Sequence, residues 1–216
     1  MTTPTVSAPR RVAFWSLRGG AGRTMALANV AAVLTHQGAR VAVRDENPEG
    51  TLHRYLGLER ADVARGLIID PRAAARVAPD FELVNLPPGS RPNFNGCAAV
   101  VPVLTPGVLS PSEVADALYA ALPAHEVKVV PLLSRCLHKG EEELGRGWGR
   151  NVARAFARAG MRRDHFHRCA VPQHIYWGFF HEACPLAVAL DGFRDVPGHP
   201  TEGYHRLAEA LIEALR

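Results

Sequence analysis

The fold is decided by residues 12–37, VAFWSLRGGAGRTMALANVAAVLTHQ. The stretch opens with a short apolar run, residues 12–17, which predicts a buried strand. A glycine-rich turn follows at once. Residues 24–37 then carry apolar side chains around most of a helical circumference, as expected for a helix packed on a sheet, and Gly38 supplies a C-terminal stop. A strand, a glycine turn and a helix in this order indicate the start of a β-α-β unit.

The alternation of strands and helices continues along the chain. Residues 40–44 form the expected second strand, and its crossover connection implies parallel pairing in a sheet that is covered on both faces. Further strands are expected at residues 81–86, 97–104, 127–133 and 170–171, and further helices at residues 112–122, 149–159 and 201–216. The sequence therefore predicts an α/β fold with a doubly wound, mostly parallel sheet.

Length and composition fit one globular domain, because the chain has 216 residues, 47% hydrophobic and 21% charged. We expect residues 1–10 to be a loose, flexible tail and residues 11–216 to be a single domain. No apolar run approaches the roughly 20 residues that a membrane helix needs. The N-terminus also lacks the basic-then-apolar layout of a signal peptide. We therefore expect a cytoplasmic protein without an integral membrane segment.

The charge balance of 25 Lys+Arg against 21 Asp+Glu leaves a net charge of +4 with histidine neutral. Only Lys128 and Lys139 are lysines, so the positive charge is almost wholly arginine, which suits phosphate or nucleic-acid contacts. A charge of +4 spread along the chain is nevertheless a weak indication of DNA binding. The four cysteines lie far apart without a C-x-x-C pair, which favours reduced thiols over disulfides.

The segment at residues 162–200 is rich in histidine and arginine and has no clear pattern. His165, His167 and Cys169 would share one face of a strand as metal ligands, but no fourth ligand follows at a recognisable spacing. The arginines of this segment would suit a nucleic-acid patch, although such a cluster is more often a solvated surface. A DNA partner is therefore an open but weakly supported expectation.

The turn at residues 17–24, LRGGAGRT, lies where open α/β sheets bind their ligands. Glycines let the backbone fold around an anion with successive N–H groups pointing inward, and the helix N-terminus adds the positive end of its dipole. The hydroxyl of Thr24 is positioned to reach Mg²⁺ beside the β- and γ-phosphates. The phosphate-binding residues expected here are Gly19, Gly20, Ala21, Gly22, Arg23, Thr24 and Met25. The alternative is a helix-capping turn that binds nothing.

This loop resembles the deviant Walker A motif of the ParA/MinD family of P-loop ATPases, K-G-G-x-G-K-S/T. Both lysine positions hold arginine, as Arg18 and Arg23. The run GRTMALANVA that starts at Gly22 is similar to a subgroup of the family in which the loop lysine is habitually arginine. The resemblance implies a P-loop NTPase that binds ATP and Mg²⁺ and forms a nucleotide-dependent homodimer, with Arg18 as a catalytic residue that reaches across it.

Two later stretches are similar to the acidic motifs of the same family. Residues 43–56, VRDENPEGTLHRYL, match a motif in which one aspartate helps hold the loop and the metal shell and a second helps place the attacking water. Asp45 keeps the first position, and Asn47 stands at the second, catalytic one. Residues 81–89, FELVNLPPG, match a strand whose aspartate supports Mg²⁺ through a water, and that position is Asn85. The resemblance thus assigns the metal to Thr24, Asp45 and Asn85.

Weaker similarity continues at Ser134, Arg135 and Pro172, which align with segments that approach the base of the nucleotide in the family. The resemblance implies that they contact the cofactor. A purely structural role for these residues is the open alternative.

Asparagine carries no negative charge with which to hold Mg²⁺ or orient a water strongly. Phosphoryl transfer depends on positioning and on neutralising charge, so Asn47 and Asn85 predict retained binding with weak or absent hydrolysis. Both also remain open as turn-forming asparagines beside prolines. Two functions follow: an ATP-binding switch that controls dimerisation or a protein partner, and a pseudo-ATPase subunit that acts only through protein contacts. If the chain is an ATP hydrolase, it is a slow one.

Overall fold

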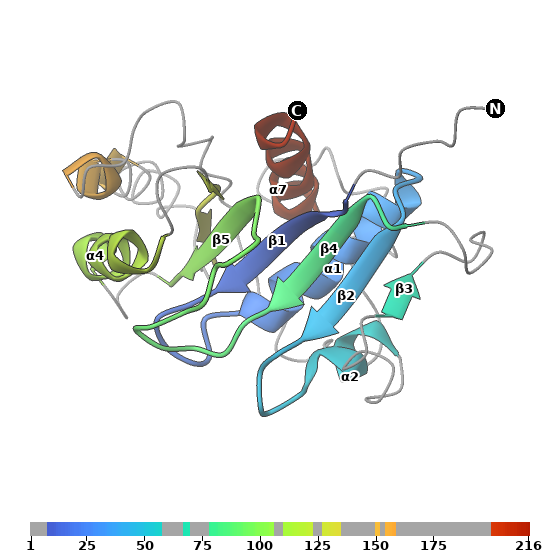
Figure 1. The fold of residues 1–216 in the computed structure, drawn as a ribbon, viewed down its shortest axis with the longest axis horizontal. Coiled ribbons are helices and arrows are strands. Elements are labelled where there is room, and N and C mark those ends of the chain that lie inside the picture. The colour runs from blue at the N-terminus through green and yellow to red at the C-terminus, as the bar shows by residue number, and fades with distance from the viewer. Residues whose placement is uncertain are drawn as a thin grey trace.

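The computed structural model describes residues 8–57, 67–69, 78–105, 110–122, 127–134, 150–151, 154–158 and 200–216. A seven-stranded sheet forms its centre, in the order β3-β2-β4-β1-β5-β6 with β7 paired to β5 (Figure 1). The strands are β1 (Arg10–Trp15), β2 (Val41–Asp45), β3 (Leu67–Ile69), β4 (Phe81–Asn85), β5 (Ala99–Leu104), β6 (Lys128–Val129) and β7 (Leu132–Leu133). All pairings are parallel except that of β3 with β2. The expected α/β fold with a mostly parallel sheet is confirmed.

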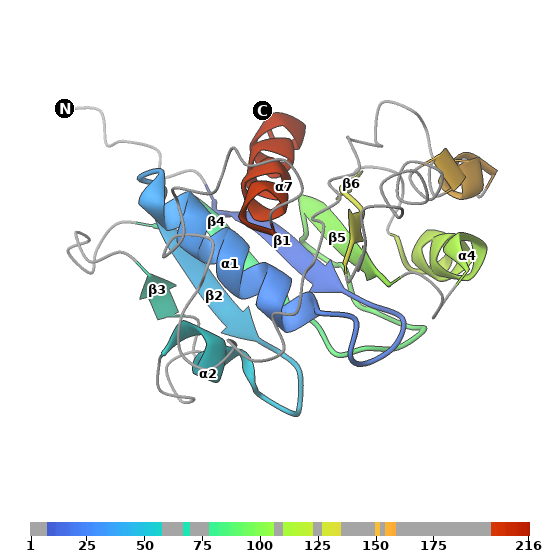
Figure 2. The ribbon, with the colours of Figure 1, turned by 180° about the vertical axis from the view of Figure 1, so that it is seen from behind.

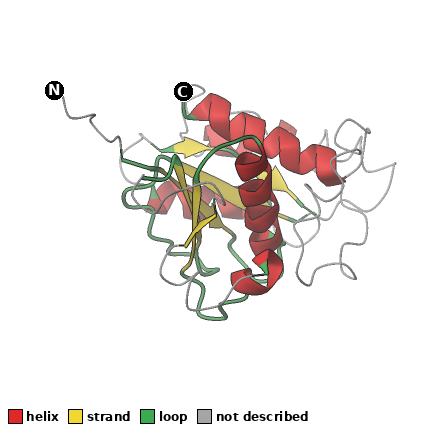
Figure 3. Cartoon of the chain, turned by 90° about the vertical axis from the view of Figure 1, so that its right-hand side faces the viewer, coloured by secondary structure: helices red, strands yellow, loops and turns green. Residues whose placement is uncertain are grey.

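Helices cover both faces of the sheet. They are α1 (Arg23–His36), α2 (Leu52–Leu56), α4 (Pro111–Ala121) and α7 (Pro200–Ala214), and residues 150–151 and 154–158 are also helical. α1 and α7 pack side by side on one face (Figure 2). α4 lies on the opposite face, and the sheet is seen between the two helical layers in Figure 3. Within the described ranges, no helix is both long and apolar enough to cross a membrane.

The central strand β1 is buried from both sides, which explains its nearly unbroken apolar sequence. Successive side chains of a strand point to opposite faces. Val12 and Phe14 therefore join the core with α1 and α7, whereas Ala13 and Trp15 join the core with α4. All four side chains are fully buried. This double coverage is typical of parallel sheets, and it fixes the carboxyl end of β1, where the glycine loop begins.

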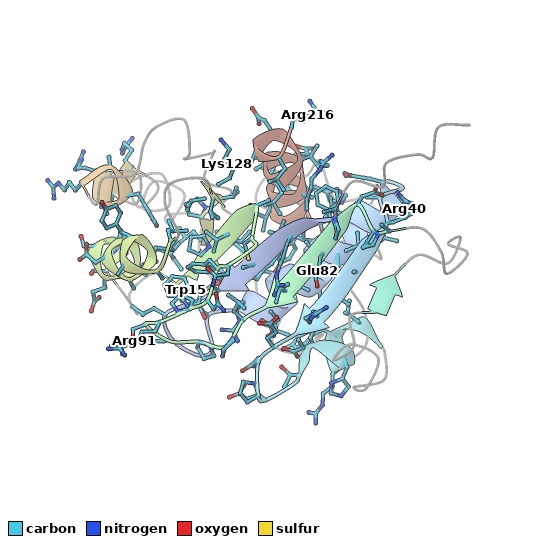
Figure 4. The ribbon with its side chains drawn as sticks, viewed as in Figure 1. Trp15, Arg40, Glu82, Arg91, Lys128 and Arg216 are labelled. Atoms are coloured by element: carbon cyan, nitrogen blue, oxygen red, sulfur yellow. The ribbon has the colours of Figure 1, made fainter. Side chains whose placement is uncertain are left out.

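The face opposite α1 also carries a small charged cluster away from the loop. Glu82 of β4 lies 3.1 Å from Arg44 and 4.0 Å from Arg11, and Arg11 pairs with Glu46 at 2.8 Å (Figure 4 labels Glu82). The parallel register explains the cluster, because Arg11 of β1 lies directly opposite Glu82. Positive and negative groups alternate, so the cluster is internally neutralised.

The structure differs from the sequence expectations in three details. β1 begins at Arg10, the last residue of the expected tail. The strand expected at residues 127–133 is divided into β6 and β7, because Pro131 has no N–H group to donate to the ladder. The antiparallel edge strand β3 was not predicted, since three residues carry too short a pattern. The expected strand at residues 170–171 and the histidine- and arginine-rich segment lie outside the described residues.

Candidate functional site

The glycine loop connects the carboxyl end of β1 to the first turn of α1. Two of its residues, Gly20 at φ +75° and Gly22 at φ +86°, adopt the left-handed conformation that favours glycine. Gly20 is exposed, and a Cβ atom built on it would meet no atom within 4 Å. A Cβ atom on Gly22 would lie 3.2 Å from the Oγ atom of Ser134. The loop is therefore open on its outer side and tightly packed on its inner side.

Two hydroxyl groups hold the inner side of the loop in place. Ser134, directly after β7, donates a short hydrogen bond to the carbonyl oxygen of Ala21. Thr105, directly after β5, donates to the same oxygen at 3.5 Å. Both side chains are buried. The nucleotide contact expected of Ser134 stays a prediction, and its hydroxyl here contacts the loop backbone.

The backbone donors in the first turn of α1 have no acceptor among the described residues. The N-cap of α1 is Gly22, which has no side chain to cap the helix, and the first turn holds no acidic residue, whereas α4 begins with a capping box between Ser110 and Glu113. In the part of the chain that the structure describes, no acceptor contacts the N–H groups of residues 19–25. These donors and the positive end of the helix dipole together make a site for an anion.

Arg23 lies beside these donors and is almost fully buried, with 6% of its surface exposed. Its Nε–H donates to Oδ1 of Asn85 at 2.7 Å, and its Nη1–H donates to Oγ of Ser16 at 3.1 Å. Burial lowers the pKa of Arg23, and the negative charges of Asp45 and Glu49 oppose that shift. A guanidinium remains protonated in proteins and carries five N–H donors. Arg23 therefore adds a fixed positive charge at the first turn of α1, with N–H groups beyond the two that contact Asn85 and Ser16.

Asn85, at the end of β4, links this cation to a carboxylate. Its Nδ2 group donates to Oδ1 of Asp45 at 2.8 Å and to Oγ1 of Thr24 at 3.3 Å. The Asn85 side chain is completely buried. We call Ser16, Arg23, Thr24, Asp45 and Asn85 the Asn85 network. It joins the ends of β1, β2 and β4 to the first turn of α1.

The Asp45 carboxylate also accepts hydrogen bonds from two backbone N–H groups. Its Oδ1 atom accepts from the N–H group of Asn47 at 3.1 Å, and its Oδ2 atom accepts from the N–H group of Leu52 at 2.9 Å. With the bond from Asn85, the carboxylate accepts three N–H groups. It therefore organises the turn between β2 and α2.

The expected Mg²⁺ ligands lie together but do not fit a Mg²⁺ ion in this arrangement. Mg²⁺ takes oxygen ligands in nearly ideal octahedral geometry, whereas Asn85 turns an NH₂ group toward Thr24 and Asp45. Both Asp45 oxygens already accept protein N–H groups. The described residues also contain no group of three or more His, Cys, Asp or Glu that could hold a metal ion.

The remaining expected site residues are not part of the Asn85 network. Arg18 is exposed, and only its carbonyl oxygen takes part in the loop, as acceptor of the Ser16 hydroxyl at 2.8 Å. Asn47 is buried beside Asp45. Met25 is half-buried against the core, and its carbonyl oxygen accepts from Asn29. Arg135 and Pro172 lie outside the described residues. The catalytic roles of Arg18 and Asn47 remain predictions.

Two residues of the site, Ser16 and Thr105, and one contact of Gly89 were not predicted from the sequence. Ser16 is the polar residue directly after β1 and before the glycines, and this position in the sequence was the signal available. Thr105 likewise follows an apolar strand directly. Gly89 belongs to the matched stretch at residues 81–89, but its contact was not predicted, because its carbonyl oxygen accepts from the indole of Trp15, 74 residues earlier, at 2.9 Å.

Comparison with known proteins gives a structural match only. No known protein family matches the sequence, and no curated protein matches it. A chain of the MinC:MinD cell division protein complex of Aquifex aeolicus matches with a TM-score of 0.62 and 18% identity, over 94% of this chain and 96% of that one. The MinD cell division protein of Aquifex aeolicus matches with a TM-score of 0.63 and 18% identity, over 94% and 97%. At this identity the similarity establishes a shared fold.

Proposed function

We propose that the chain binds ATP through residues 19–25 and Arg23 and acts as a nucleotide-dependent switch that controls its own dimerisation or a protein partner. The observation that carries the proposal is the set of backbone N–H groups in the loop that no described residue contacts, beside a buried arginine. A triphosphate supplies the negative charge that such donors accept. The fold shared with MinD, which one of the matching structures records in complex with MinC, supports a partner-directed role.

Binding and hydrolysis make different demands on this site. Binding needs the backbone N–H groups of the loop and the positive charge of Arg23, and the site has both. Hydrolysis additionally needs a positioned water and neutralisation of developing charge. Asn47 and Asn85 carry no charge for either task, and Asn85 is fully committed to the network. The second candidate function is a pseudo-ATPase subunit. It is supported by the Asn85 amide, whose hydrogen bonds to Arg23 and Asp45 occupy it within the protein.

The expected hydrolysis rate is therefore very low. Loss of one electrostatic or positioning group commonly costs on the order of 10²- to 10³-fold in rate, and two such groups are replaced here. Phosphate release from ATP in the presence of Mg²⁺ should not exceed that of the Arg23→Ala variant. A steady-state turnover that disappears in Arg23→Ala would overturn this expectation and make the chain an active ATPase.

A matched pair of glycine substitutions tests the binding site. Gly20 and Gly38 are both exposed, both left-handed at φ +75° and φ +91°, and both free of atoms within 4 Å of an added Cβ. Gly20→Asp and Gly38→Asp therefore impose the same backbone strain and the same charge, but only the first places a carboxylate in the loop. Calorimetric titration with ATP should show at least about 10-fold weaker binding for Gly20→Asp.

The Gly38→Asp variant should bind ATP as the wild type does, because position 38 lies at the far end of α1. Equal affinity of the two variants would place the nucleotide elsewhere on the molecule. Circular dichroism of both variants shows whether their folds are equally preserved.

A further inference from the structure

We propose that this site takes the phosphates of the nucleotide without a divalent cation, so that the metal-free nucleotide is the ligand. The inference rests on the proposed function and specifies its chemistry. Its basis is the orientation of the Asn85 side chain, whose NH₂ group occupies the side of the amide that faces Thr24 and Asp45.

Arg23 determines that orientation. A guanidinium can only donate, so the Asn85 atom that faces Nε of Arg23, at 2.7 Å, must be the oxygen. Rotating the amide by 180° would bring two donor groups together and would leave Asp45 facing an oxygen. The NH₂ group is therefore directed at Asp45 and Thr24 for as long as Arg23 holds its position. Arg23 and Asn85 thus act as a pair.

The charges of the network are balanced without a metal. Arg23 is positive, Asp45 is negative, and the neutral amide of Asn85 joins them through bonds of 2.7 and 2.8 Å. A divalent cation beside Thr24 would have to displace the amide from Asp45 and would lie close to the fixed positive charge of Arg23. Like charges at short range in a buried site repel strongly.

Thr24 then interacts with phosphate as a donor. Its Oγ1 atom accepts the N–H group of Asn85 at 3.3 Å, which leaves its own proton available for a phosphate oxygen. The spare N–H groups of Arg23 and the loop backbone add further donors. These groups replace the cation as the source of positive potential around the phosphates.

The test is calorimetric titration of the full chain with ATP in two buffers, one with EDTA and one with excess MgCl₂. The wild type should bind in EDTA at least as tightly as in Mg²⁺, because Mg²⁺ sequesters the free nucleotide. The Asn85→Asp variant replaces the NH₂ group by a carboxylate oxygen. It should bind ATP on the order of 10-fold more tightly in Mg²⁺ than in EDTA.

Asn95→Asp is the matched control, since it makes the same change at an exposed loop position. Its ATP affinities in EDTA and in Mg²⁺ should match those of the wild type. Wild-type binding that requires Mg²⁺ would overturn the metal-free inference and leave the proposed function standing. An absence of ATP binding in both buffers would overturn the proposed function itself. The two wild-type titrations decide the question even if Asn85→Asp does not fold.

Discussion

Arg23→Ala is expected to weaken ATP binding by about two orders of magnitude. Hydrogen bonds from a charged donor contribute about 1.5–3 kcal/mol each, and every 1.4 kcal/mol is a factor of ten in affinity. Loss of two such bonds to phosphate gives an expected penalty of about 3 kcal/mol or more. The effect is large because Arg23 is almost fully buried, so its charge is poorly screened by water.

The same substitution also affects folding stability. It leaves Oδ1 of Asn85 and Oγ of Ser16 without their donor, in a place where both side chains are buried. An unsatisfied buried group costs about 1–3 kcal/mol, so chemical denaturation must accompany the titration. Arg23→Lys retains the charge but cannot donate to both acceptors in the same fork geometry. It should bind ATP with an intermediate affinity.

Arg11→Ala is the matched control for net charge. Arg11 pairs with Glu46 and lies near Glu82 on the sheet face opposite α1, away from the loop. Its removal should leave the ATP affinity within about twofold of the wild type. If Arg23→Ala binds ATP as tightly as Arg11→Ala does, the buried arginine does not contact the nucleotide.

Trp15→Ala is expected to have the largest effect on stability, about 3–5 kcal/mol in the free energy of unfolding. The indole is fully buried and is part of the core on the face of the sheet that α4 covers. It meets the ring of Phe94 edge-on at 6.0 Å, and its N–H group donates to the carbonyl oxygen of Gly89 at 2.9 Å. Removal therefore creates a cavity and leaves an unsatisfied carbonyl group. Urea denaturation measures the change.

Tyr119→Ala is the comparison for Trp15→Ala, because Tyr119 of α4 has 48% of its surface exposed. Its loss should change the unfolding free energy by about 0.5 kcal/mol or less. Trp15→Phe keeps most of the ring but removes the hydrogen bond, and it separates the two contributions. A loss below about 1 kcal/mol for Trp15→Ala would mean that the core relaxes around the missing ring.

The consequences of Trp15→Ala should extend to the loop. Gly89 is held from two sides, since its N–H group also donates to the carbonyl oxygen of Ser16 at 3.3 Å. Ser16 in turn accepts a hydrogen bond from Arg23. Packing of one tryptophan is thereby connected to the position of the proposed phosphate-binding arginine.

The arrangement of the sheet could be predicted because its signals are local. An apolar β1 followed by a glycine loop and an apolar α1 indicates a buried parallel strand with a crossover helix, and this is what forms. The division of the strand at residues 127–133 could also have been predicted, since the sequence has a proline, Pro131, within it. The left-handed conformations of Gly20 and Gly22 agree with the predicted turn.

The chemistry of the site could be predicted only in part. The resemblance assigned Thr24, Asp45 and Asn85 to one site, and their side chains are hydrogen-bonded to one another in the structure. The direction of the Asn85 amide, however, depends on Arg23, 62 residues earlier in the chain. From the sequence alone, asparagine at the aspartate position of the motif indicates only the loss of a negative charge. Its effect on metal binding becomes visible only when the donor opposite it is known.

Binding of ATP to the glycine loop underlies every other prediction for this protein. The most direct measurement is a calorimetric titration of the wild-type chain with ATP in EDTA, with light scattering to follow the mass of the particle. We expect saturable heat at one nucleotide per chain and an increase in particle mass from monomer to dimer. No heat in either EDTA or Mg²⁺, with an unchanged particle mass, would contradict it and would favour a subunit that acts through protein contacts alone.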